Sequence, residues 1–137
     1  MAQEKSSDRQ TSRQTGQDGE RVAANFLKSR GYRILDMNFQ NGSGRRLGEI
    51  DIIAKDPSQN EIIFAEVKTR EYTRYKNTLP EENINRQKLR KLDKIAAFYL
   101  KKNGLESCGY RFDALSVWLD YETRRAKIKH IPNIYLL

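Results

Sequence analysis

The chain has little of several residue types that mark common classes of protein. Among its 137 residues it has one cysteine, Cys108, and one histidine, His130. A single cysteine excludes an intrachain disulfide and a cysteine-rich zinc site. No apolar run approaches the roughly 18 residues of a membrane span, and residues 1–14 lack the apolar core of a signal peptide. These absences predict a cytoplasmic protein with no membrane partner.

Charge is present in excess and mostly of one sign. The chain has 26 Lys and Arg residues against 18 Asp and Glu residues, a formal net charge of +8. Such a balance favours a polyanionic partner. Nucleic acid and an anionic membrane surface both fit the charge, and we expect nucleic acid and no membrane. A basic surface without a partner is the alternative. A length of 137 residues suits one domain with its own core.

The hydrophobic pattern predicts one mixed α/β domain over residues 15–137, after a polar and disordered tail over residues 1–14. Two helices are expected, over about 15–30 and 85–102, and Thr15 with Asp18 has the spacing of a capping box at the first start. Strands are expected over residues 32–39, 49–54, 61–67, 110–119 and 126–131. The resulting order is αβββαββ.

Two of these strands carry charged residues among apolar ones. Asp51 lies in the second strand, and Glu66 and Lys68 lie in the third. The short polar turn between the two strands predicts an antiparallel hairpin. With Ala54 opposite Glu61, Asp51 lies diagonal to Glu66; after a slip of two residues, Asp51 lies directly opposite Glu66. Both registers bring the two acids together on one face.

Strand alternation also groups the neighbours of Asp51. Glu49 shares a face with Asp51, and Ile50 and Ile52 are expected on the other face. Glu49 is either a further metal ligand or an ion-pair partner of a lysine or arginine. Glu20, at the border of the apolar face of the first helix, is either part of the site or an acid that favours the helix macrodipole.

Paired buried carboxylates repel each other, and a divalent cation removes that cost. Oxygen ligands favour Mg²⁺ or Mn²⁺ over zinc or copper. Lys68 lies two residues beyond Glu66, where it can contact a phosphate oxygen or orient an attacking water. These groups are the parts of metal-assisted phosphodiester hydrolysis.

The same residues resemble a known motif. Glu20, then Gly48-Glu49-x-Asp51, then Glu66-Val67-Lys68 is similar to the pattern of the PD-(D/E)xK nuclease superfamily in its Holliday-junction-resolvase-like branch. From about Gly19 to His130-Ile131-Pro132-Asn133 the chain resembles the small bacterial YraN family of that branch.

The resemblance implies a restriction-endonuclease-like fold, a mixed β-sheet flanked by helices. It implies that Asp51 and Glu66 are ligands of Mg²⁺ or Mn²⁺, that Lys68 is a catalytic lysine, and that Glu20 is an auxiliary acid. Resolvase-like relatives act as dimers because a four-way junction has two symmetric strands to cut, so a homodimer is one assembly that the resemblance allows.

Basic and aromatic residues flank the predicted acidic strands. Arg and Lys neutralise phosphates, and tyrosines stack on unpaired bases. The alternative is an ordinary solvated loop. The candidate nucleic-acid-binding residues are Arg45, Arg46, Arg70, Tyr72, Arg74, Tyr75 and Lys76.

Other polar residues have a simpler interpretation. Gln87 and Lys88 begin the second helix and could approach the site, but a solvated helix start is the favoured interpretation. Asp113 is expected as a paired structural acid rather than a third ligand. His130 is expected as a structural histidine, since no nucleophile is marked beside it.

The sequence therefore predicts a metal-dependent endonuclease acting on DNA, favoured over RNA, with branched and flapped DNA as candidate substrates. The alternatives are a nucleic-acid-binding module with little or no cleavage activity and a protein-binding adaptor with a basic surface.

Overall fold

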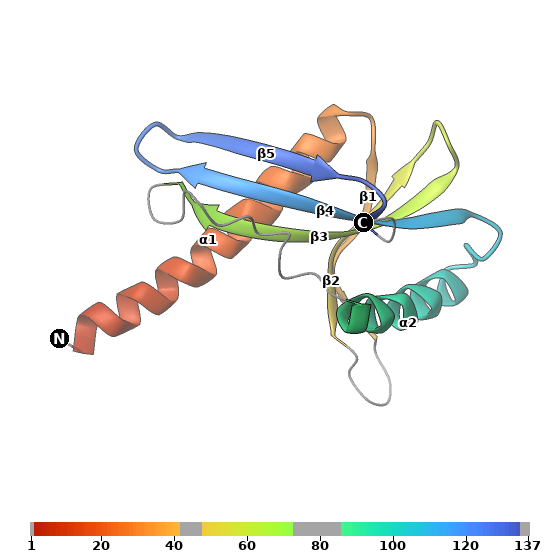
Figure 1. Ribbon diagram of the computed structural model, residues 1–137, viewed down its shortest axis with the longest axis horizontal. Coiled ribbons are helices and arrows are strands. Elements are labelled where there is room, and N and C mark those ends of the chain that lie inside the picture. The colour runs from red at the N-terminus through yellow and green to blue at the C-terminus, as the bar shows by residue number, and fades with distance from the viewer. Residues whose placement is uncertain (1, 42–47, 73–85, 135–137) are drawn as a thin grey trace.

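The computed structural model describes residues 2–41, 48–72 and 86–134, with side chains from Ser12 onward (Figure 1). Its elements follow the order αβββαββ that the sequence predicts. They are α1 (Ala2–Ser29), β1 (Arg33–Gln40), β2 (Glu49–Asp56), β3 (Glu61–Glu71), α2 (Arg86–Lys102), β4 (Gly109–Asp120) and β5 (Arg125–Ile131). Neither of these helices is long and apolar enough to cross a membrane.

The strands of the described chain form one mixed sheet in the order β1-β2-β3-β4-β5. Neighbouring strands are antiparallel, except that β3 and β4 run parallel. Parallel neighbours need a long crossover connection, and α2 lies in that connection. The expected fold class, a mixed sheet flanked by helices with a nuclease-like order of elements, is confirmed.

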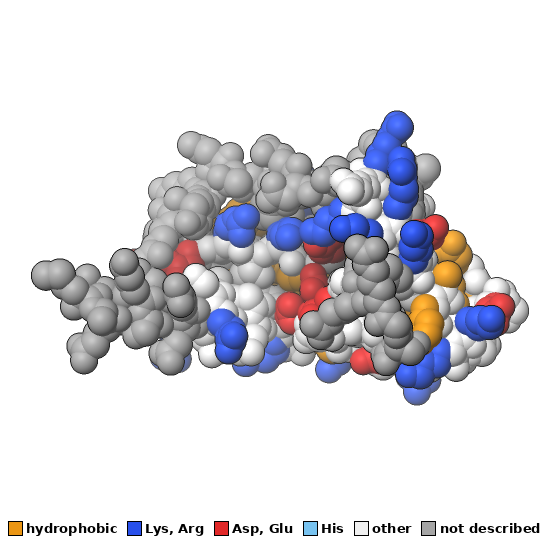
Figure 2. All heavy atoms as spheres, turned by 90° about the horizontal axis from the view of Figure 1, so that it is seen from below, with side chains coloured by type: hydrophobic (Ala, Val, Ile, Leu, Met, Phe, Trp, Pro, Cys, Tyr) orange, Lys and Arg blue, Asp and Glu red, His pale blue; other side chains and the backbone are white. Residues whose placement is uncertain are grey.

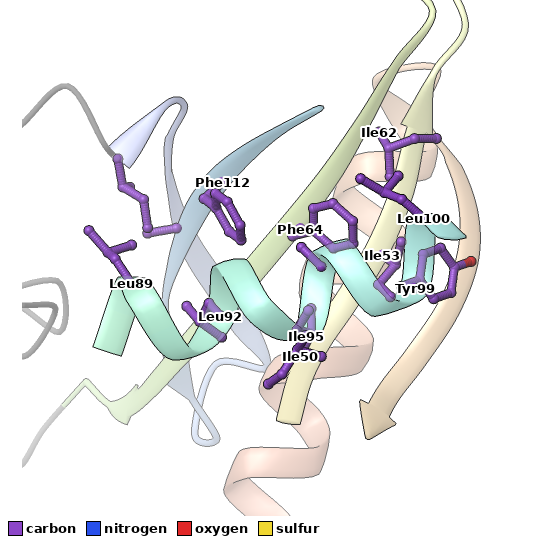
Figure 3. Packing of buried hydrophobic residues seen from close by; sticks show 13 residues of the cluster. Ile50, Ile53, Ile62, Phe64, Leu89, Leu92, Ile95, Tyr99, Leu100 and Phe112 are labelled. Atoms are coloured by element: carbon purple, nitrogen blue, oxygen red, sulfur yellow. The ribbon is translucent and has the colours of Figure 1, made fainter. Parts of the chain in front are cut away.

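Each helix covers one face of the sheet, and each interface is a separate hydrophobic core. On the α1 side, Ala23 and Leu27 pack on strand residues such as Ile52, Ile63 and Val117. On the α2 side the helix packs on residues of β2, β3 and β4, as Figure 3 shows: Leu89, Leu92, Ile95, Tyr99 and Leu100 meet Ile53, Ile62, Phe64 and Phe112.

Helix α1 begins earlier than the sequence pattern predicts. Its first residue is Ala2, whereas the expected start was Thr15 after a disordered tail over residues 1–14. Residues 2–14 contain neither glycine nor proline, so a formed helix can continue through them. The Thr15–Asp18 pair has another role, since the Tyr121 hydroxyl bonds to Asp18 at 2.8 Å and to Thr15 at 3.4 Å.

The β2–β3 hairpin has the second of the two expected registers. Ala54 pairs with Ile63 and Ile52 with Ala65, and one further step would set Asp51 opposite Glu66. The ladder ends before that step. Beyond it, Ile50 packs in the α2-side core while Ile52 packs in the α1-side core, so the expectation that they share a face is wrong.

A close contact positions α1 against the sheet. Gly19 faces Thr69 of β3, and a Cβ on Gly19 would lie 1.8 Å from Thr69 Oγ1 and 2.6 Å from Thr69 Cβ. Only a residue without a side chain fits this crossing. Because Glu20 is the next residue, the same contact holds Glu20 beside the sheet.

Replacing Gly19 should therefore destabilise the protein. We expect Gly19→Ala to lower the free energy of unfolding by about 1–3 kcal/mol, because the added methyl group overpacks the helix–sheet contact. Gly16→Ala is the matched control: it lies in the same helix with no described atom within 4 Å of the new Cβ, and it should be neutral or stabilising by up to about 1 kcal/mol. Urea unfolding measures both. The double variant Gly19→Ala/Thr69→Gly should recover part of the loss, and equal effects of the two alanines would contradict the contact.

Candidate active site

Carboxylates from α1 and β2 meet where the β2–β3 ladder ends. Glu20, Glu49 and Asp51 each offer an oxygen, and these oxygens lie within 4.8 Å of one another. Asp51 Oδ2 also accepts a hydrogen bond from the backbone N–H of Val67 at 2.8 Å. The Asp51 carboxylate thus accepts the hydrogen bond that a backbone carbonyl of β2 would accept if the ladder continued. The three acids form a group that could hold a metal ion.

Two of these acids are held by amide side chains. Asn38 of β1 hydrogen-bonds to the Glu20 carboxylate, and its φ of 54° lies in the left-handed region that asparagine tolerates. Gln40 Nε2 donates to Glu49 Oε2 at 3.0 Å. The sequence pattern did not identify either amide. Glu49 joins the acid group rather than a lysine or arginine ion pair among the described residues.

Glu66 lies beside this group and is bound by two lysines. Its Oε1 forms an ion pair with Lys88 of α2 and lies 3.5 Å from the Lys68 ammonium. Its Oε2 is buried and has no hydrogen-bond partner among the described residues. Lys88 is therefore part of the site, and the expectation of a solvated helix start is wrong for this residue.

Asp51 and Glu66 belong to one site. Both line a small cavity of about 10 Å³ between β2, β3 and α2, a volume near that of a single water. Figure 2 shows acidic side chains near the middle of the face seen from below, next to a row of lysine and arginine side chains. The predicted convergence of Asp51, Glu66 and Lys68, with Glu20 nearby, is therefore what the structure has.

The crowding of acids changes their protonation. Burial raises the pKa of Asp51 to about 7; the Val67 hydrogen bond opposes the rise, and the neighbouring carboxylates add to it. Burial, together with the charge of Glu49, also raises the pKa of Glu20, although the Asn38 hydrogen bond lowers it. Burial lowers the pKa of Lys88, but the contact with Glu66 outweighs it, so the net shift is upward. Without a cation, the repulsion between these carboxylates and their burial make it unfavourable for all of them to be ionised at once.

Two of the predicted nucleic-acid-binding residues are described. Arg70 follows Glu66 and Lys68 at two-residue spacing on β3, and its guanidinium donates to the Thr69 carbonyl at 3.1 Å. Tyr72 is 45% exposed, with its backbone N–H bonded to Leu119. The other five lie outside the described residues: Arg45, Arg46, Arg74, Tyr75 and Lys76.

A second polar network lies near the ends of β4 and β5. Asp113 is fully buried and accepts hydrogen bonds from Arg111 at 3.0 Å and from the Asn133 backbone at 3.0 Å. His130 Nε2 lies 2.6 Å from its other oxygen. Burial raises the pKa of Asp113, but these partners outweigh it and hold the pKa below its usual value. The expectation of a paired acid at Asp113 is confirmed, and His130 is one of its partners.

Comparison with known proteins places the chain in a family. A family model described as "Uncharacterised protein family UPF0102" matches residues 19–117, a span that contains all the acids and lysines of the site. The chain belongs to this family. UPF0102 is the YraN family, so the resemblance seen in the motifs is confirmed.

Relatives in this family match over most of their length. The UPF0102 protein of Caldicellulosiruptor saccharolyticus is 37% identical over 90% of this chain and 98% of its own length. The Moorella thermoacetica protein is 39% identical over 91% of this chain and 98% of its own. The Persephonella marina protein is 42% identical over 74% and 81%, respectively. These names state a family and no activity.

The raised pKa of Asp51 makes the stability of the metal-free protein pH-dependent. An aspartate titrates near 4 in an unfolded chain and Asp51 at about 7 in the folded one. The folded state therefore binds the proton more tightly, and wild-type stability falls as the pH rises from about 4 to about 7, by on the order of 4 kcal/mol. Asp51→Asn keeps an acceptor for Val67 and removes this loss.

In EDTA we expect Asp51→Asn to be more stable than wild type at pH 8 and equal to it near pH 4. Denaturant unfolding at the two pH values measures the difference. Glu122→Gln, which neutralises an exposed acid in a turn remote from the site, should give no such pH-dependent gain. A gain from Asp51→Asn that is the same at both pH values would contradict the raised pKa.

Proposed function

We propose that this UPF0102 protein is a Mg²⁺- or Mn²⁺-dependent nuclease that hydrolyses phosphodiester bonds in DNA. The observation that carries the proposal is the group of Glu20, Glu49 and Asp51 oxygens within 4.8 Å of one another, beside a carboxylate held by two lysines. Family membership is consistent with this function, through the resemblance of its motif to the PD-(D/E)xK nucleases.

The residues of the site suit a hard divalent cation. All candidate ligands are carboxylate oxygens, which Mg²⁺ and Mn²⁺ prefer. Glu66 Oε2 is a buried oxygen without a described partner, which costs free energy that a cation can offset. A bound cation would polarise a phosphoryl oxygen and make water a better nucleophile. Glu20, Glu49, Asp51 and Glu66 are the residues that would hold it.

The lysines supply the remaining parts. Lys88 from α2 and Lys68 from β3 both contact Glu66 Oε1, so this carboxylate is fixed and its Oε2 stays directed to the site. With Lys88 in place, Lys68 need not serve as the sole counter-ion of Glu66. The Lys68 ammonium can then contact a phosphate oxygen or orient the attacking water. Asn38 and Gln40 hold the other acids in place.

The direct test is cleavage of linear, flapped and four-way DNA and of RNA in the presence of Mn²⁺. Wild type should cleave DNA only with the cation. Asp51→Asn and Glu66→Gln should abolish cleavage and weaken Mn²⁺ binding in calorimetry. Lys68→Ala should lower the rate by about 10²–10⁴-fold, the usual size of a lost proton-transfer or orienting group, with little loss of DNA affinity. Glu122→Gln should behave as wild type.

The outcomes separate the proposal from its alternatives. DNA binding at low salt without turnover under any metal would indicate the nucleic-acid-binding module. Neither binding nor turnover would favour the protein-binding adaptor. Unchanged Mn²⁺ affinity in both Asp51→Asn and Glu66→Gln would remove these residues as ligands.

Lys88 provides a separate prediction, because no sequence motif includes it. Lys88→Met keeps the length of the side chain but removes its ammonium, leaving Lys68 as the remaining described counter-ion of Glu66. We expect kcat to fall at least tenfold with KM nearly unchanged, and Lys88→Arg to restore much of the loss. Steady-state cleavage with Mn²⁺ over a range of DNA concentrations gives kcat and KM for both variants. Wild-type kcat in Lys88→Met would show that the ion pair has no role in the reaction.

A further inference from the structure

Helix α2 carries most of the net charge of the protein. Its 17 residues include seven Lys or Arg and one Asp, a formal charge of +6, against +8 for the whole chain. Its apolar side is buried in the core, so the basic residues other than Lys88 all point outward. We call these exposed residues the α2 basic face: Arg86, Arg90, Lys91, Lys94, Lys101 and Lys102.

This arrangement does not stabilise the helix by itself. Arg86/Arg90 and Arg90/Lys94 have i, i+4 spacing, and Lys91/Lys94 has i, i+3 spacing, so like charges are neighbours along the face. Each such pair is unfavourable by a few tenths of a kcal/mol. The first turn has no acidic residue to favour the helix macrodipole. The single acid, Asp93, accepts a hydrogen bond from Tyr110 of β4 at 3.4 Å.

The α2 basic face begins next to the acidic site, by which we mean Glu20, Glu49, Asp51 and Glu66. Lys88, in the first turn of the helix, pairs with Glu66. Leu89 and Leu92 beside it are buried against the sheet, which fixes the rotation of the helix (Figure 3). Lys91, three residues after Lys88, therefore lies on the same side of the helix, roughly 5 Å along the axis from a residue that contacts the site.

A nucleic acid fits this surface better than a membrane does. A membrane-surface helix inserts an apolar face into the lipid, but the apolar face of α2 is buried in the protein core. A phosphate backbone needs only exposed cations. At 1.5 Å per residue the helix is about 25 Å long, which corresponds to about seven base pairs at 3.4 Å each.

We propose that the α2 basic face is the main contact for the DNA backbone and guides it to the acidic site. The part of this proposal in which DNA is guided to the acidic site rests on the proposed nuclease function. The DNA binding by the α2 basic face does not. Backbone contacts of this kind carry no sequence information, so this surface selects nucleic acid by charge and shape. Sequence-independent binding with a strong salt dependence is the expected behaviour.

The experiment compares two triple variants with the same loss of charge. Arg90→Gln/Lys91→Gln/Lys94→Gln alters the α2 basic face. Lys28→Gln/Arg33→Gln/Arg125→Gln removes three exposed charges elsewhere on the described surface. Binding of a labelled 20-base-pair DNA duplex is followed by fluorescence anisotropy in EDTA, so that no cleavage occurs, over a series of KCl concentrations.

We expect the α2 variant to lose roughly tenfold or more in affinity and to have a log Kd against log salt slope shallower by up to about 2.7, or 0.9 per lost phosphate contact. The control variant should keep a slope close to that of wild type. The melting temperature of the α2 variant should not fall below that of wild type, because the substitutions remove repulsion between like charges. A wild-type slope in the α2 variant, or equal changes in both variants, would overturn the proposal.

Two further results separate this proposal from the nuclease function. If wild type never cleaves DNA but the α2 variant still loses binding, the binding surface stands and the nuclease function fails. If wild type cleaves and the slopes coincide, the nuclease function stands and the α2 surface fails. Binding of wild type to phosphatidylserine vesicles, lost in the α2 variant while duplex binding is kept, would assign the surface to a membrane and overturn the proposal.

Discussion

The site depends on one hydrogen bond, from the Val67 backbone N–H to Asp51 Oδ2. A side chain here takes the acceptor position that a neighbouring strand normally supplies, so the β2–β3 ladder ends at Ile52 and Ala65. Ile50 can then turn to the α2-side core. Where the ladder ends, the carboxylates of β2 can meet residues that come from both faces of the sheet.

The two helices contribute different residues to the site. α1 approaches closely at Gly19 and brings the Glu20 carboxylate to Asp51. α2 brings the Lys88 ammonium to Glu66 from the other side. Negative charge is thus gathered at the start of β2 and positive charge at the start of α2. Under the proposed nuclease function, the second group would attract an anionic substrate, and a cation held by the first group would bring its phosphate there.

The sequence predicts the elements and the core of the site because both follow from local pattern. Alternation along β3 puts Glu66 and Lys68 on one face, and the short turn after β2 limits the hairpin to registers that bring Asp51 to Glu66. Prediction from the sequence pattern fails where tertiary contacts determine the direction of a side chain. The reversal at Ile50 depends on the Val67 hydrogen bond, and the role of Lys88 depends on how α2 rotates against the sheet.

The reversal at Ile50 has a cause that also explains why the site is found at the end of the ladder. A regular sheet satisfies its backbone through its own ladder, so a carboxylate buried inside it has to find donors in side chains or loops, as Asp113 does with Arg111 and the Asn133 backbone. At the end of the ladder Val67 N–H is free to donate, and Asn38, in a left-handed conformation, can turn its amide to Glu20. Irregular backbone therefore allows several acids to gather at one place, from the partly buried Glu20 and Asp51 to the exposed Glu49. Pattern-based prediction, which assumes regular strands, identifies the acidic residues of the site but misses a residue that depends on irregular backbone, such as Asn38.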